Sequence, residues 1–202
     1  DRLYEALDLI VENTQYLSKT IDDFRNFFKA DKQIEDFCVN DSILKVLKLL
    51  KSSIQNHNID VETCFDGELI INGYPNEFLQ VLVNLVNNAR DVLISQPIDA
   101  RFLTINTYSK LNKIIIEVCD NGGGIDESII SKIFEPYFTT KHKSQGTGIG
   151  LYMSHQIVVE HMKGQIYAKN IEIEKNGKFY KGCSFIISLP INESKTLEDY
   201  II

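Results

Sequence analysis

The stretch of sequence that decides the fold is IIIEVCDNGGG, residues 114–124. It begins as a run of residues typical of a strand and ends in Asp120, followed by three glycines at 122–124. Glycines permit positive φ angles and let a ligand approach the backbone closely. A carboxylate where a strand ends is well placed for binding, and it can accept a hydrogen bond from the exocyclic amine of adenine. Alone, a glycine-rich turn is often only a turn, so this signal is modest.

The preceding segment predicts an amphipathic helix over residues 75–94, with a proline in its first turn. Asn84 and Asn88 are four residues apart, so their side chains point the same way. Asparagine is a mediocre helix former, and a plain solvated face usually carries Lys, Glu and Arg. A row of short amides favours a pocket wall that offers oxygens to a hard cation such as Mg²⁺. The apolar face consists of Phe78, Leu82, Leu85, Val86, Ala89 and Leu93, and the opposite face of Gln80, Asn84, Asn87, Asn88 and Asp91.

A second glycine-rich stretch, GTGIGL at 146–151, leads into a further predicted helix. Alternating glycines before a helix are typical of a phosphate site, because free N–H groups and the positive end of the helix dipole face the anion. The spacing is neither that of a P-loop nor that of the dinucleotide fingerprint in its usual place. Between the two glycine-rich stretches, residues 133–144 read as a hinged flap in which Lys141 and Lys143 could reach phosphate oxygens.

In this order, the Asn-rich helix, DNGGG at 120–124, FEPYFTTK at 134–141 and GTGIGL at 146–151 resemble the N, G1, F and G2 boxes of sensor histidine kinases. These kinases belong to an ATPase superfamily that includes gyrase, a heat-shock chaperone and mismatch-repair proteins. The resemblance covers residues 37–190, and the EPYFTTK wording is similar to the nitrogen-regulation type. The linked set is specific, although each box alone is not.

The resemblance implies a site for ATP and Mg²⁺. It makes Asn88 the metal ligand and Asn84 a second ligand or phosphate contact, and both are expected to serve catalysis. It implies that Asp120 binds the adenine amine and that residues 134–147 form a mobile lid. Many relatives carry Lys or Arg three residues after the metal Asn, where this chain has Asp91. The other implied nucleotide contacts are Gly122, Gly124, Ile125, Phe134, Thr140, Lys141, Gly146, Thr147, Gly148, Ile149, Gly150 and Leu151.

Residues 1–30 predict one long helix with an apolar seam that repeats at alternating spacings of four and three. The seam favours a dimeric helical bundle over a helix lying on its own domain, and it resembles the second helix of the kinase dimerisation domain. The expected organisation is this helix, a linker at 31–36, an ATP-binding domain at 37–190 and a tail at 191–202. The seam consists of Leu3, Leu7, Ile10, Thr14, Leu17, Ile21, Phe24 and Phe28.

The expected fold is an α+β two-layer sandwich: a mixed, mainly antiparallel sheet with helices on one face. Strands are expected at 37–39, 59–65, 68–72, 102–108, 113–119, 165–173 and 180–189. The segments 59–65 and 68–72 are expected to pair with each other around Asp66-Gly67. Helices are expected up to Asn56, with Asn40 or Asp41 as the N-cap, and over 150–162.

Composition sets limits on function. The chain has 202 residues, 44% hydrophobic and 24% charged, with a net charge of −7, so general affinity for nucleic acid is not expected. No run approaches the length of a membrane helix, so any membrane contact is expected only through upstream domains, and the location is expected to be cytoplasmic. Four scattered cysteines read as reduced thiols.

The residues favour a kinase over a hydrolase. In hydrolysing members of the superfamily a Glu stands four residues before the metal Asn and orients water; here that residue is Asn84, which cannot act as a base. The resemblance implies transfer to a histidine and onward to an aspartate of a cognate response regulator. None of the four histidines lies in the acceptor context, so the chain is not expected to phosphorylate itself. The alternatives are a superfamily ATPase, a serine-directed kinase, or a binding module without turnover.

Overall fold

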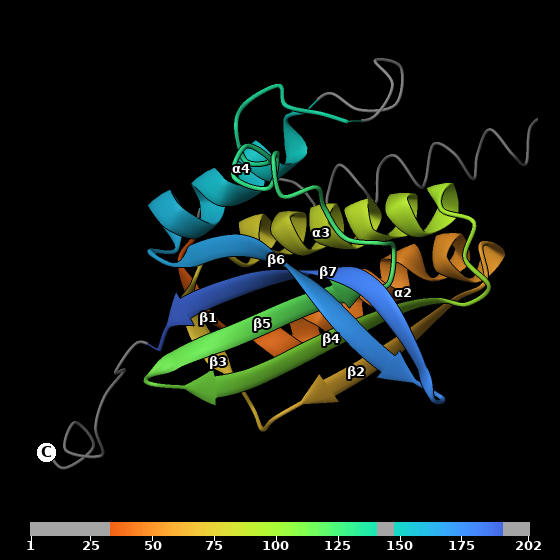
Figure 1. Cartoon of the computed structure of the whole chain (residues 1–202). Helices are drawn as coiled ribbons and strands as arrows, with labels where there is room; N and C mark the ends of the chain where they lie inside the picture. Colours follow the sequence, from red (N-terminus) through yellow and green to blue (C-terminus); the bar gives the residue numbers. More distant parts are fainter. Residues whose placement is uncertain (1–32, 141–147, 192–202) are drawn as a thin grey trace, which may run out of the picture. The chain divides into compact units, whose positions relative to one another are not determined.

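A computed structural model describes residues 33–140 and 148–191. Its main sheet has five strands in the order β2-β4-β5-β7-β6, and all neighbours pair antiparallel except β2 and β4. Helices cover one face of this sheet (Figure 1). The predicted α+β sandwich is therefore confirmed. The strands are β2 Ile59–Phe65, β4 Arg101–Lys110, β5 Lys113–Asp120, β6 Gln165–Lys175 and β7 Lys178–Pro190.

The helical layer consists of α2 (Val39–Asn56), α3 (Pro75–Ser95), and α4 (Gly150–Gln156), which continues as the short π-helix η1 (Ile157–His161). The apolar face predicted for α3 is buried in full: Phe78, Leu85 and Leu93 are each 0% exposed. They pack toward sheet residues such as Ile105 and Ile116, each at most 1% exposed. Each such side chain contributes about 1.5–3 kcal/mol relative to leaving it in water, so the position of α3 against the sheet is set by its apolar face.

The predicted pairing of 59–65 with 68–72 is wrong. β2 instead pairs in parallel with β4, and β3 (Ile70–Gly73) pairs with β1 (Glu35–Cys38) in a separate two-stranded sheet. Gly67 has φ +73, so the turn exists. It redirects the chain between two sheets rather than closing a hairpin, and α3 then returns the chain to β4 beside β2.

The predicted cap of α2 is also wrong. The helix begins at Val39, and its N-cap, Cys38, makes no side-chain capping bond. The Asn40 side chain serves a tertiary contact instead: its Nδ2 donates to the Gly67 carbonyl oxygen at 2.7 Å, and its Oδ1 accepts from the Thr107 hydroxyl at 2.7 Å. Asn40 thus joins the first turn of α2 to the turn after β2 and to β4.

Two boundaries differ from expectation. The strand expected at 37–39 is β1 at Glu35–Cys38, so it includes part of the expected linker, and the helix expected over 150–162 changes to a π-helix at Ile157. The expected helix at 1–30 and the tail from 192 lie outside the described residues, so the predicted division into domains stays a prediction. Within the described part of the chain, no helix is long and apolar enough to span a membrane.

Candidate functional site

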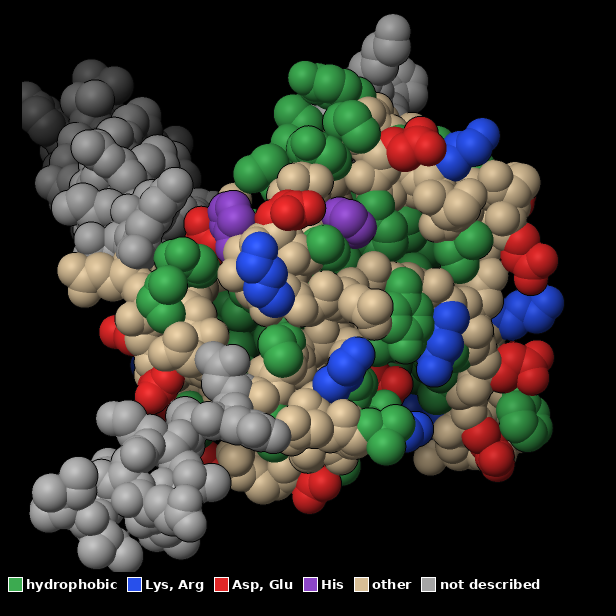
Figure 2. All heavy atoms as spheres, turned by 90° about the vertical axis from the view of Figure 1, so that its left-hand side faces the viewer, with side chains coloured by type: hydrophobic (Ala, Val, Ile, Leu, Met, Phe, Trp, Pro, Cys, Tyr) green, Lys and Arg blue, Asp and Glu red, His purple; other side chains and the backbone are tan. Residues whose placement is uncertain are grey.

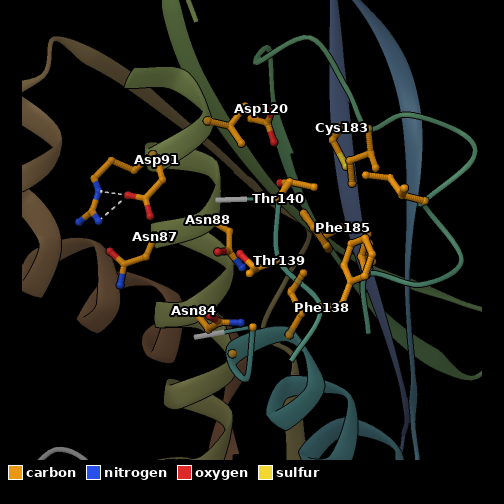
Figure 3. A pocket seen from close by; sticks show the side chains of 18 of the residues that line it. Asn84, Asn87, Asn88, Asp91, Asp120, Phe138, Thr139, Thr140, Cys183 and Phe185 are labelled. Carbon is orange, nitrogen blue, oxygen red and sulfur yellow. Dashed lines mark hydrogen bonds and ion pairs between the residues drawn. The ribbon is translucent and has the colours of Figure 1, made fainter. Parts of the chain in front are cut away.

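A pocket of about 560 Å³ lies between α3, the end of β5, the middle of β7, the loop from 124 to 140 and the beginning of α4. Figure 3 shows amides from α3 on one side, Asp120 at one end, and Cys183 and Phe185 of β7 opposite. The pocket is lined by Asn84, Asn87, Asn88, Arg90, Asp91, Val92, Asp120, Gly124, Ile125, Ile129, Ile133, Phe138, Thr139, Thr140, Gly148, Gly150, Leu151, Cys183 and Phe185.

Asp120 is the most deeply buried acid of the pocket, with 3% of its surface exposed. Burial raises its pKa from 3.8 to about 6, although backbone hydrogen bonds from Gly122 and Cys183 partly offset this. The Gly122 N–H donates to Oδ1 at 2.8 Å. A buried carboxylate without a cationic partner is costly, so a ligand that donates hydrogen bonds would satisfy it.

The glycines next to Asp120 are required by close approaches. A Cβ on Gly122 would lie 2.1 Å from Cγ1 of Val92, and a Cβ on Gly182 would lie 1.8 Å from the Asp120 carbonyl oxygen. Gly122 therefore supports Asp120 from behind and is not among the lining residues. Cys183 follows Gly182, and burial together with the charge of Asp120 raises the pKa of its thiol to about 12. The thiol thus acts as an uncharged wall beside Asp120.

The loop after Asp120 is fixed at both ends by side-chain amides. Asn121, only 2% exposed, accepts a hydrogen bond from the Phe102 N–H at 2.9 Å and donates to the Ala100 carbonyl at 2.7 Å. Asn170 of β6 receives the Ile125 N–H and donates to the Ile125 carbonyl, both at 2.7 Å. Gly124, with φ +86, passes so close to Asn170 that a Cβ would lie 2.7 Å from its Oδ1. These contacts hold Gly124 and Ile125 at the pocket.

At the opposite end of the pocket, α3 meets the beginning of α4. Nδ2 of Asn84 donates to the Ser154 hydroxyl oxygen at 2.9 Å, and that hydroxyl donates to the Gly150 carbonyl at 3.1 Å. A Cβ on Gly150 would lie 2.3 Å from Oδ1 of Asn84. Asn88 lies one turn further along the same wall (Figure 3). The two asparagines are thus brought together at the pocket, as predicted from their spacing.

Thr139, Thr140 and Gly148 line the pocket between these two ends. Gly148, with φ +68, lies against the backbone of residues 137–138: a Cβ there would be 2.4 Å from the Tyr137 carbonyl carbon. Exposed apolar side chains flank this region, including Tyr137 at 76%, Ile149 at 38% and Met153 at 40%. Figure 2 shows hydrophobic side chains gathered along the upper edge of one face of the molecule.

Phe134 and Ile149, both expected to contact nucleotide, are not among the lining residues. Phe134 packs behind the pocket, with its ring centroid 5.6 Å from that of His155 and 6.4 Å from that of Phe185. It therefore supports Phe185, which does line the pocket. Lys141, Gly146 and Thr147, which were also expected at the site, lie outside the described residues.

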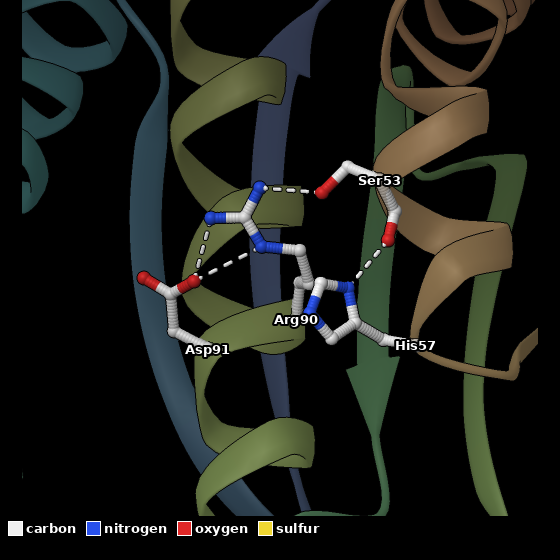
Figure 4. A network of polar contacts seen from close by, with 4 residues as sticks. All are labelled: Ser53, His57, Arg90 and Asp91. Carbon is white, nitrogen blue, oxygen red and sulfur yellow. Dashed lines mark hydrogen bonds and ion pairs between the residues drawn. The ribbon is translucent and has the colours of Figure 1, made fainter.

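Arg90 and Asp91 form an ion pair at the rim of the pocket (Figure 4). Nε and Nη2 of Arg90 lie 3.0 and 2.6 Å from Oδ1 of Asp91, and Nη1 donates to the Ser53 hydroxyl of α2 at 3.1 Å. His57 in turn contacts the Ser53 carbonyl at 2.7 Å. Among the described lining residues, the one cationic side chain, Arg90, is therefore paired with Asp91 and directed toward α2.

The three described histidine side chains make their contacts outside the pocket. Besides His57 at Ser53 and His155 at Phe134, Nδ1 of His161 lies 2.6 Å from Oε2 of Glu77. His142 lies outside the described residues. None of these three rings is among the lining residues.

Amide oxygens are the groups suited to a cation here. Among the described residues, no group of three or more His, Cys, Asp and Glu side chains could hold a metal ion. Mg²⁺ commonly keeps several waters and binds through a few protein oxygens together with substrate phosphates. Asn84 and Asn88 fit that pattern, with a ligand supplying the charge.

Sequence reasoning assigned no role to five positions that shape the site: Asn121, Ser154, Asn170, Gly182 and Cys183. Each acts through a partner far along the chain, such as Asn84 for Ser154 and Ile125 for Asn170. A sequence pattern reports local spacing, so only Gly182, as a glycine inside a predicted strand, could have been singled out, because such a glycine often marks close backbone approach.

Comparison with known proteins places these residues in a family. The family model described as histidine kinase-, DNA gyrase B-, and HSP90-like ATPase matches residues 73–193. The two-component sensor PprA of Pseudomonas aeruginosa is 34% identical over 149 residues, 72% of this chain and 15% of PprA. Sensor histidine kinase ZraS of Salmonella typhimurium is 30% identical over 193 residues, 93% of this chain and 38% of ZraS. The chain thus spans much less than two thirds of these curated relatives.

Solved structures of histidine kinases have a similar fold. The catalytic domain of histidine kinase ThkA, in a nucleotide-free form, has a TM-score of 0.64 at 30% identity, covering 78% of this chain and 95% of that one. ThkA in complex with the response regulator protein TrrA has a TM-score of 0.62 at 23% identity, covering 93% of this chain and 51% of that one. The latter likeness concerns the fold alone.

Proposed function

The chain belongs to the family of histidine kinase-, DNA gyrase B-, and HSP90-like ATPases, an ATP-binding family, and from this premise we propose that it is the catalytic domain of a sensor histidine kinase. It binds Mg-ATP in the pocket described above and transfers the γ-phosphoryl group to a histidine of a dimerisation domain. The observation that carries the proposal is the joint lining of one pocket by Asp120, Asn84 and Asn88.

Asp120 selects the base in this proposal. As a carboxylate it accepts a hydrogen bond from the 6-amino group of adenine, and Gly122 and Cys183 hold it by backbone hydrogen bonds. A 6-oxo purine presents an acceptor at this position instead, and two acceptors face each other unfavourably. Guanine and hypoxanthine nucleotides are therefore expected to bind weakly.

Asn84 and Asn88 would hold the cation with their amide oxygens. When bound, Mg²⁺ would neutralise charge on the β- and γ-phosphate oxygens. The phosphates lie against the backbone of Gly148 and of Gly150, the first residue of α4, with Thr139 and Thr140 alongside. The expected contacts of Lys141, Gly146 and Thr147 belong to the same proposal.

The pocket lacks an evident base for hydrolysis. Among the described lining residues, the carboxylates are Asp91, which is paired with Arg90, and Asp120. At the position where hydrolysing relatives carry Glu stands Asn84, whose amide cannot accept a proton from water. Slow hydrolysis preserves the γ-phosphoryl group for the histidine acceptor, whose imidazole nitrogen forms the new P–N bond while ADP leaves.

The partners follow from the same proposal. The heptad seam of residues 1–30 would join two copies of the chain, and an aspartate of a response regulator would receive the phosphoryl group, as the ThkA–TrrA complex supports for a related protein. A dimeric mass in light scattering that becomes monomeric when residues 1–30 are removed is the expected result for the seam. A cytoplasmic location is part of the proposal and stays a prediction.

The decisive experiment supplies the full-length natural protein with ATP labelled at the γ-phosphate. We expect label on protein that is lost in acid and stable in base, as for phosphohistidine, and no label in the Asp120→Asn variant. Acid-stable label would favour a serine-directed kinase. Free phosphate without labelled protein would favour an ATPase, and nucleotide binding with neither product would favour a binding module.

A further inference from the structure

The contact between α3 and α4 contains a buried hydroxyl that the proposed chemistry has not used. Ser154 is 2% exposed and lies on α4, 70 residues along the chain from Asn84. Its oxygen receives the Asn84 Nδ2–H at 2.9 Å, and its own proton goes to the Gly150 carbonyl at 3.1 Å. The two hydrogen bonds of Ser154 thus join the wall of α3 that carries Asn84 and Asn88, here called the metal wall, to the beginning of α4.

The hydrogen-bond inventory fixes the direction of the Asn84 amide. A serine hydroxyl has one proton to donate, and here the carbonyl one turn earlier takes it. Toward Asn84 the oxygen can therefore only accept, so it faces the NH₂ group and not the carbonyl. Oδ1 of Asn84 then lies over Gly150, 2.3 Å from where a Cβ would be, and Gly150 lines the pocket.

We propose that Ser154 is a positioning residue for metal–nucleotide binding: its hydroxyl orients the Asn84 amide so that the oxygen, not the NH₂ group, is presented at the pocket. An amide NH₂ repels a cation, so a flipped Asn84 would oppose Mg²⁺ where an oriented one ligates it. The same bonds connect the backbone of the first turn of α4 to the metal wall of α3. This inference rests on the proposed function, because it assigns the metal side of the pocket to Asn84.

Ser154→Ala tests the inference. It leaves the amide with no acceptor on α4 and lets both orientations occur. We expect the Mg²⁺ concentration that gives half of the gain in ATP affinity to rise about three- to tenfold, the size of one hydrogen bond's contribution. Affinity for adenosine, which lacks phosphates, should be unchanged. Calorimetric titrations of the natural protein with both ligands, over a series of Mg²⁺ concentrations, provide these values.

The chain offers a matched control. Ser42 is also buried, at 4% exposure, and also donates to the carbonyl four residues earlier, Cys38, at 3.0 Å. Its hydroxyl lies in α2, away from Asn84. Ser42→Ala should lower the Tm about as much as Ser154→Ala. The Mg²⁺ concentration that gives half of the gain in ATP affinity should stay at the value of the natural protein.

A double-mutant cycle separates positioning from general support. If Ser154 acts through Asn84, Ser154→Ala should change the Mg²⁺ response little once Asn84 is Ala. Equal effects in both backgrounds would overturn the inference, as would a parallel loss of adenosine affinity. A natural protein whose ATP affinity ignores Mg²⁺ would instead overturn the metal assignment of the proposed function, and the inference with it.

A measurement without any variant guards against loss of folding. In the nucleotide-free protein, NMR should show that one of the two Asn84 side-chain amide protons exchanges with water much more slowly than those of an exposed asparagine, because it is bound to a buried hydroxyl. Exchange as fast as that of an exposed asparagine amide would show that Ser154 does not hold the amide, and would overturn the inference.

Discussion

The two ends of the pocket are built in different ways. At the end proposed for adenine, which we call the adenine end, Asp120 lies on a central strand, paired on one side with Leu103 of β4 and on the other with Cys183 of β7. At the end proposed for the phosphates, which we call the phosphate end, Asn84 makes a side-chain hydrogen bond to Ser154 of a different helix. The first end is held by backbone ladders and close glycine packing, and the second by single side-chain hydrogen bonds between helices.

This difference predicts how each end responds to change. A substitution at the adenine end should lower both the stability of the fold and the affinity for nucleotide, because the same backbone serves both. A substitution at the phosphate end should lower the affinity for phosphate groups and Mg²⁺ while the fold stays stable. The largest effect is expected at the adenine end and the smallest at the phosphate end.

Gly182→Ala should destabilise the protein by about 3 kcal/mol, at the upper end of the usual cost of overpacking. The new Cβ would lie 1.8 Å from the Asp120 carbonyl oxygen, so β5 and β7 must separate. Denaturant unfolding gives the value. Gly123→Ala is the comparison: its φ of +97 strains an alanine, but nothing lies within 4 Å of the new Cβ, so about 1 kcal/mol is expected. Equal losses would show that the close approach does not matter.

Asp120→Asn should stabilise the nucleotide-free protein at pH 8. Because the folded pKa of about 6 lies above the ordinary 3.8, the folded state binds more protons between these values. Its stability therefore falls as pH rises through this window, by on the order of 3 kcal/mol. The variant lacks this loss, so its advantage should be full at pH 8 and vanish near pH 3. Unfolding at several pH values measures it, with the exposed Asp99→Asn as control; a pH-independent difference would contradict the burial effect.

The same Asp120→Asn substitution should weaken binding of ADP by about 100-fold, since a hydrogen bond to a charged group contributes about 1.5–3 kcal/mol and the amide can turn a donor toward the adenine amine. Natural-protein affinity should also fall as pH drops below about 6, where the carboxylate protonates. Calorimetry over pH 5 to 8 tests both. An unchanged affinity in the variant would remove Asp120 from the adenine site.

Gly150→Ala should have the smallest effect. Its Cβ would displace Oδ1 of Asn84, 2.3 Å away, and this atom ends a side chain that can move. We expect the Mg²⁺-dependent part of ATP affinity to fall about tenfold, or about 1.4 kcal/mol, while adenosine affinity and Tm stay near natural values. A large drop in Tm would show that the phosphate end is built into the fold as firmly as the adenine end.

The sequence predicted what local spacing determines. The apolar face of α3, the strand ending in Asp120, and the shared direction of Asn84 and Asn88 are all periodic features, and each is found in the structure. The residues that fix their orientation were missed because their partners are distant: 70 residues separate Asn84 from Ser154, and 45 separate Ile125 from Asn170.

The two wrong predictions have the same cause. Asn40 looks like a cap because asparagine favours N-cap positions, but its side-chain amide instead bonds to the buried Thr107 hydroxyl and to the Gly67 carbonyl. The segments 59–65 and 68–72 look like a hairpin because a turn separates them, but β2 pairs with the longer strand β4. In both cases a tertiary contact outweighs a local preference that is worth only about 1 kcal/mol.

The parallel pairing of β2 with β4 makes α3 part of the crossover between two neighbouring strands. A helix in that position cannot detach without also releasing the strands that it connects. Amide protons in the middle of α3, next to Asn84 and Asn88, should therefore exchange with solvent only through global unfolding. The wall proposed to bind the cation would then belong to the slowest-opening cooperative unit of the protein, and nucleotide could bind and leave without that wall being rebuilt.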